Sequence, residues 1–84
     1  ELARAQLASS QSQLAEARSL LALAESSLKR QQELAARKLT SDAALEQAQS
    51  DRDARAARLG SLQRATEVAA EQVAVAELNL ANTE

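Results

Sequence analysis

The sequence predicts an all-α protein whose chain folds into an antiparallel two-helix coiled-coil hairpin. Alanine, the strongest helix former, accounts for 21 of the 84 residues, proline is absent and Gly60 is the single glycine. Leucines recur at seven-residue intervals in the first half, which is the spacing of a coiled-coil seam. The middle of the chain carries end signals for one helix followed by start signals for another, so we expect the chain to reverse there.

The first helix is expected over about residues 2–37. One heptad row is dominated by leucine and comprises Leu7, Leu14, Leu21, Leu28 and Ala35. The companion row holds mostly small side chains and comprises Ala3, Ser10, Ala17, Ala24 and Gln31. Large residues in one row and small residues in the other let two helices approach closely, which favours a narrow antiparallel pair.

The tip of the hairpin is expected at residues 38–41. Arg37 and Lys38 suit the negative end of the first helix dipole, and Ser41 is a favourable N-cap for the second helix, with Asp42 in its first turn. No glycine marks a left-handed residue at the end of the first helix. The alternative is one continuous helix, about 126 Å long. The similar length of the two seams favours the hairpin.

The second helix is expected over about residues 42–83. Its first row comprises Leu45, Arg52, Leu59, Thr66, Val73 and Leu80. Its second row comprises Ala48, Arg55, Leu62, Ala69, Ala76 and Thr83. Two interpretations are open at Arg52 and Arg55. Either the phase slips so that Ala54 and Ala57 turn inward, or the arginine stems lie along the seam with their charged heads in water.

The composition excludes most catalytic and metal-binding functions. The chain has no His and no Cys, which removes the usual ligands of zinc, copper, haem and iron–sulfur clusters as well as Ser-His and Cys-His catalysis. Glu67 and Glu71 share a helix face, but an exposed coiled coil offers no pocket in which they would work as an acid/base pair. We therefore expect no enzyme activity, no cofactor and no metal site.

The charge pattern argues against a nucleic-acid partner. The net charge is −2 and there are no aromatic side chains on which bases would stack. A basic stripe of Arg52, Arg55 and Arg58 is interleaved with Asp51 and Asp53. We interpret this stripe as a solvated face or as a contact with a neighbouring hairpin.

The residues around the expected tip resemble a known family. Arg30 is followed by Leu34 four residues later and by Ser41 seven residues after that, and the second helix continues with Leu45 and Ala48. This pattern resembles the tip of the α-helical hairpin in periplasmic adaptor proteins, also called membrane fusion proteins, of the HlyD-like family. The closing stretch, residues 78–84, resembles the point where the family's chain re-enters a lipoyl-like β domain.

The resemblance implies a function in export. Such hairpins stand in a ring, commonly of six copies, and their tips dock onto a TolC-like outer-membrane channel in tripartite efflux or type I secretion systems. Arg30, Leu34 and Ser41 are then the residues that bind the channel. The full-length protein would be periplasmic, anchored to the inner membrane, and in contact with an inner-membrane transporter through other domains. Because the chain opens on Glu1 in mid-pattern, we expect it to be a segment excised from a larger multidomain protein.

The sequence departs from the family pattern just before Ser41. Lys38, Leu39 and Thr40 stand where the family often has a glycine and a β-branched residue, and Ala44 stands where an acidic residue often completes a capping box. These differences predict a less sharp turn with a weaker cap. The competing hypothesis is a generic structural coiled coil, a dimerisation or spacer segment, which would need an uninterrupted helix.

Overall fold

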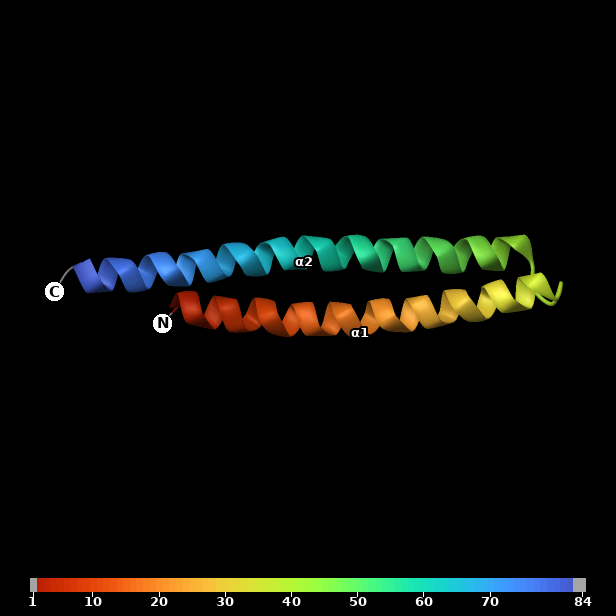
Figure 1. Ribbon diagram of the computed structural model, residues 1–84, viewed down its shortest axis with the longest axis horizontal. Helices are drawn as coiled ribbons and strands as arrows, with labels where there is room; N and C mark the ends of the chain where they lie inside the picture. Colours follow the sequence, from red (N-terminus) through yellow and green to blue (C-terminus); the bar gives the residue numbers. More distant parts are fainter. Residues whose placement is uncertain (1, 83–84) are drawn as a thin grey trace.

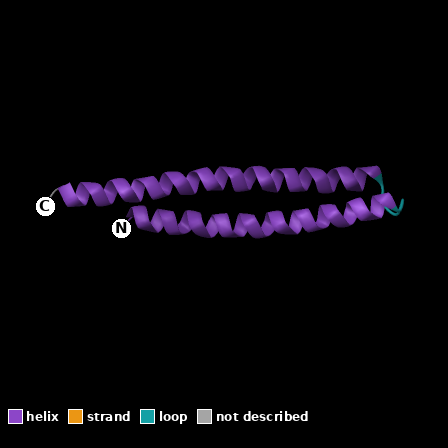
Figure 2. Cartoon of the chain, viewed as in Figure 1, coloured by secondary structure: helices purple, strands orange, loops and turns teal. Residues whose placement is uncertain are grey.

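The protein forms a two-helix antiparallel hairpin. The computed structural model describes residues 2–82, which form α1 (Leu2–Ala36) and α2 (Asp42–Asn82). The two helices pack side by side along their length and both chain termini lie at the same end (Figure 1). Figure 2 shows that the described part of the chain is helical except for the connecting loop. The all-α hairpin predicted from the sequence is confirmed.

The dimensions of the molecule exclude the single continuous helix. The hairpin measures 69 × 13 × 13 Å along its principal axes, whereas one uninterrupted helix would be about 126 Å long. α1 ends at Ala36, one residue before the expected end, and α2 is described as far as Asn82. The expected end of the second helix at residue 83 lies outside the described residues. α2 is longer than α1 and runs past its start (Figure 1).

The core is a thin line of small side chains. Among residues 2–82, the five buried hydrophobic residues are Ala17, Leu28, Ala48, Leu62 and Ala69. The accessible surface is 6203 Å², whereas a compact globular monomer of this mass exposes roughly 4,800 Å². The hairpin therefore leaves far more surface in water than a globular domain does, because a pair of helices buries only one stripe of each.

The predicted heptad seam of α1 is confirmed. Leu28 and Ala17 are buried, one from each predicted row. The remaining members of both rows are half-buried: Ala3, Leu7, Ser10, Leu14, Leu21, Ala24, Gln31 and Ala35. Serine at position 10 and alanine at positions 17 and 24 leave room for α2 to lie close to α1.

The seam of α2 follows its predicted rows except at the open end. Arg52 stays half-buried on the seam, and its Nη1 donates to Asp53 Oδ1 over 3.0 Å. Ala54 and Ala57 are exposed, so the phase slip that would turn them inward is not observed.

At the next seam position, Arg55 is exposed but lines the groove beside Leu20 and Leu62, as expected for an arginine whose stem lies along the seam with its charged head in water. Its neighbour Ala56 is half-buried.

At the open end the row prediction is wrong, because Ala76 and Leu80 are exposed. Residues this far along α2 lie beside or beyond the first turn of α1, so little of α1 remains to cover them. Thr83, the last predicted member of the row, lies outside the described residues.

Two ion pairs join the helices across one side of the seam. Arg4 Nη2 lies 2.6 Å from Glu77 Oε1, and Arg52 Nε lies 4.0 Å from Glu25 Oε2. All four side chains are more than a third exposed, so each pair contributes little to stability. Their main effect is to favour one antiparallel register over its neighbours.

α2 continues without a break through Gly60. The glycine is half-buried, and a Cβ atom built on it would meet no heavy atom within 4 Å. Nearby, the Thr66 hydroxyl donates to the Leu62 carbonyl over 2.8 Å, which satisfies this polar side chain on the seam.

Replacing Gly60 with alanine is expected to stabilise the hairpin by about 1 kcal/mol, because alanine is the better helix former and its methyl group fits without a clash. The melting temperature should rise by roughly 4–8 °C, measured by circular dichroism at 222 nm at fixed protein concentration. The exposed Ala57→Gly change is the reciprocal control and should lower the melting temperature by a similar amount. A lower melting temperature for Gly60→Ala would contradict the open space at this position.

Candidate functional site

The tip begins where α1 ends in a Schellman motif. The amide of Leu39 donates to the Leu34 carbonyl over 2.8 Å, and the amide of Lys38 donates to the Ala35 carbonyl over 3.0 Å. The Arg37 amide also donates to the Leu34 carbonyl, over 3.1 Å. These bonds satisfy carbonyls that a helix end otherwise leaves without partners. They also turn the chain sharply away from the α1 axis.

Lys38 takes the left-handed position that glycine usually fills in this motif. Its φ angle is +59°, which is rare for a residue with a Cβ atom. The sequence offers no signal for it, because a lysine at this place has no preference for positive φ. The turn is therefore as sharp as a glycine turn, contrary to the expectation of a less sharply turned tip.

The second half of the tip is built on Ser41. Its Oγ accepts a hydrogen bond from the Ala44 amide over 3.0 Å, and its carbonyl accepts one from the Leu45 amide over 3.2 Å. Ser41 is thus an N-cap on the N3 amide, as predicted. Ala44 contributes its amide alone, so the cap is one half of a capping box. Asp42 lies in the first turn of α2, where the helix dipole favours a carboxylate.

A side-chain hydrogen bond ties the loop back to α1. The Thr40 hydroxyl donates to Gln31 Oε1 over 2.9 Å, and both side chains are partly buried. Gln31 closes the companion row of the α1 seam at this end. The bond therefore fixes the loop to the last polar position of the seam. The heptad spacing predicts Gln31 on the seam, but nothing in the sequence indicates its contact with Thr40.

The three predicted contact residues lie at this end of the hairpin. Arg30 is exposed and makes no hydrogen bond or ion pair within residues 2–82. Leu34 follows one turn later on α1 and is half-buried, so part of its side chain remains accessible. Ser41 is exposed at the start of α2. The fold thus gathers an accessible cation, a partly accessible leucine and an accessible hydroxyl around one loop.

Two further features of the tip were not singled out from the sequence. Leu39, within the loop, is 66% exposed and is the one large apolar side chain on the loop itself. Residues 29–42 carry Lys29, Arg30, Arg37 and Lys38 against two acidic residues, a net charge of +2 in a chain of net charge −2. The tip is therefore a basic end on an otherwise acidic rod.

The described residues form no metal centre. Within residues 2–82, no three acidic side chains come close enough together to hold a metal ion. Neither helix in this part of the chain is long and apolar enough to cross a membrane. No family model, characterised protein or solved structure matches this chain.

Replacing Lys38 with glycine is expected to stabilise the hairpin by about 1 kcal/mol, because the strain of a Cβ atom at positive φ is removed. Urea unfolding followed by circular dichroism measures the change. Lys38→Ala is the matched control, since it removes the charge but keeps the Cβ atom. An equal gain for Lys38→Ala would show that charge, and not backbone strain, is responsible.

Replacing Ser41 with alanine is expected to destabilise the hairpin by about 1 kcal/mol, because the Ala44 amide loses its acceptor. Ser41→Asp should retain most of the stability, since aspartate is an equally good N-cap. The same urea titration measures both variants. Unchanged stability of Ser41→Ala would mean that water replaces the cap at no cost.

Proposed function

We propose that this hairpin is the docking arm of a periplasmic adaptor protein, and that its tip binds a TolC-like outer-membrane channel in a tripartite efflux or type I secretion system. One observation carries the proposal: the chain reverses at the residues whose pattern resembles the tip of that family. Arg30, Leu34 and Ser41 therefore lie at one end of a 69 Å rod instead of being spread along it.

The chemistry of the tip suits a helical partner with exposed carbonyls and carboxylates. The guanidinium of Arg30 has no partner within the described chain, so all its donors are available to a partner. The Ser41 oxygen is occupied as an acceptor by the Ala44 amide, but its hydroxyl proton is still available to donate. Leu34 adds an apolar contact one turn beyond Arg30.

The charge of the tip adds a steering effect. The net charge of +2 over residues 29–42 attracts an acidic receiving surface and repels a basic one. Because these side chains are exposed, the attraction is screened by salt. The proposed partner surface is therefore acidic, and association should slow as ionic strength rises.

In the proposed assembly the arm is one part of a larger machine. The full-length protein resides in the periplasm, is anchored to the inner membrane, and contacts an inner-membrane transporter through its other domains. Copies of the hairpin form a ring, hexameric in this family, with their tips toward the channel. A spacer made of a continuous parallel coiled coil is disfavoured, because the helix is interrupted at residues 37–41.

The proposal is tested by Leu34→Asp and Ser41→Asp in the full-length protein. Both are expected to reduce export and cross-linking to the channel by about tenfold or more, the effect of losing one well-packed interface contact. Ser41→Asp is the sharper of the two, because aspartate keeps the N-cap and removes the hydroxyl donor.

Ser19→Asp is the matched control, because Ser19 is exposed in the middle of α1, far from the tip. It should leave export unchanged. Circular dichroism of each variant hairpin checks that the helices remain folded. Wild-type export by both tip variants would contradict the proposal.

A further inference from the structure

The two sides of the hairpin differ in what they present to solvent. Arg4 and Glu25 each directly follow a residue of the companion row of α1, and both make ion pairs with α2. Leu20 and Ser27 each directly precede a residue of the leucine row. In a heptad these two kinds of position flank the seam on opposite sides. Among residues 2–82, two ion pairs thus bridge the helices on one side, and none bridges them on the other.

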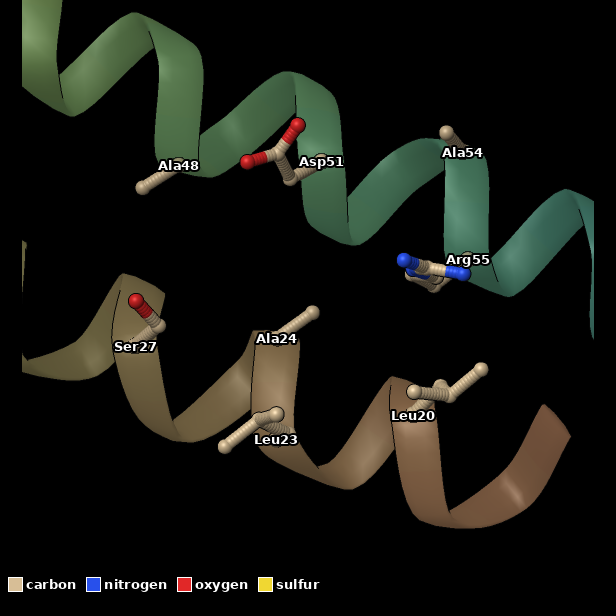
Figure 3. Close-up of a pocket in the computed structure, with 8 residues that line it drawn as sticks. All are labelled: Leu20, Leu23, Ala24, Ser27, Ala48, Asp51, Ala54 and Arg55. Carbon is tan, nitrogen blue, oxygen red and sulfur yellow. The ribbon is translucent and has the colours of Figure 1, made fainter. Parts of the chain in front are cut away.

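The side without ion pairs carries an open groove, which we call the groove face. Its larger part has a volume of about 400 Å³ and lies between Leu20 and Leu23 of α1 and Asp51 and Ala54 of α2 (Figure 3). A smaller part of about 140 Å³ adjoins it, because Leu20 and Arg55 line both. The groove therefore runs along the middle of the hairpin.

Exposed apolar side chains continue the groove face from the groove to the open end of the rod. On α1, Leu23 lies three heptads after Leu2. On α2, Val68 lies two heptads after Ala54, and Val75 lies three heptads after it. Residues separated by whole heptads share a face, so all of them lie on the side of the groove. Leu2, Leu23, Val68 and Val75 are 73%, 65%, 52% and 56% exposed. These side chains add apolar surface to the side that carries the groove.

The charges of the groove face identify its occupant. Glu16, Arg55 and Arg58 line the groove, and none makes a hydrogen bond or ion pair among residues 2–82. Asp51 accepts one hydrogen bond, from Gln47. Glu16 and Arg58 carry opposite charges at neighbouring positions of this face, so they complement the same two residues on a second copy. A nucleic acid or an anionic membrane would instead require an excess of basic residues.

We infer that two copies of this chain pair through the groove face, with their tips at the same end, to form a four-helix bundle. A two-fold axis parallel to the rod places each residue of one copy at the same position along the rod as the identical residue of the other copy. Leu23 then meets Ala54 of the second copy, because the two residues line the same part of the groove. Glu16 likewise meets Arg58 of the second copy, and Leu2 meets Val75.

The opposite orientation covers less of the exposed apolar surface. In that orientation the tips point in opposite directions, and a two-fold axis perpendicular to the rod pairs Leu20 of one copy with Leu23 of the other. Leu2 and Val68 then lie against the tip loop of the second copy. Val75 then projects beyond the second copy altogether. With the tips together, the groove and the exposed apolar side chains are covered from Ser27 to Leu2, a length of about 38 Å at 1.5 Å per residue. Two helices side by side are about 20 Å wide, so each copy contributes about 750 Å², close to the roughly 800 Å² of a standard interface.

This pairing lies along the arms and does not depend on the docking function proposed for the tip. Its first test is sedimentation equilibrium of the 84-residue chain over a range of concentrations. The expected species has twice the 8.9 kDa mass of one chain. Ala54→Glu on the groove face should weaken association about tenfold or more, because it buries an unpaired charge.

Ala57→Glu is the matched control, because Ala57 is exposed on the same helix, three residues away, and faces outward. It should leave the dimer intact. A monomer at all concentrations overturns the inference, and so does equal weakening by both variants.

The orientation is tested by spin labels on Leu39→Cys, in a chain that has no other cysteine. With the tips together, the labels in the dimer should lie within about 30 Å of each other, since packed helices are about 10 Å apart. With the tips at opposite ends, and the two-fold axis passing between Leu20 and Leu23, the two labels should lie about 50 Å apart. The longer distance would overturn the proposed arrangement.

Discussion

Every feature of this hairpin depends on a seam between two helices that is one stripe wide. Three of its five buried side chains are alanine, which lets the helices lie close together but removes little apolar area from water. The interhelical ion pairs are too exposed to compensate. The seam therefore defines the register of the hairpin but leaves most of both helices in solvent.

The turn is the second constraint, because the seam works only if the chain reverses in the right register. Lys38 adopts positive φ, Ser41 caps α2, and Thr40 is tied to Gln31. Together these contacts satisfy backbone groups at both helix ends and join the loop to the seam. The tip is thus an ordered turn and not a flexible linker. A structured tip presents a cation, a leucine and a hydroxyl to a partner without having to order them first.

The heptad rows made most of the fold predictable. Every row residue of α1 lies on the seam, and the reversal was indicated by Arg37 and Lys38 followed by Ser41. The positions of the predicted contact residues followed from that reversal alone. The left-handed Lys38 and the Thr40 contact were not predictable. Each results from competition between the conformational preference of a residue and its contacts with neighbouring segments. A seven-residue repeat carries no information about those contacts.

The sequence by itself determined that the chain is helical, where it reverses, and which stripe of each helix faces the other. These properties depend on helix propensity and on seven-residue spacing, which act over short stretches of chain. Only the tertiary structure decided which flank of the seam is bridged by ion pairs and which carries the larger groove. That difference arises because Arg4 and Glu77, or Leu23 and Ala54, come to the same height only once the helices are packed in register.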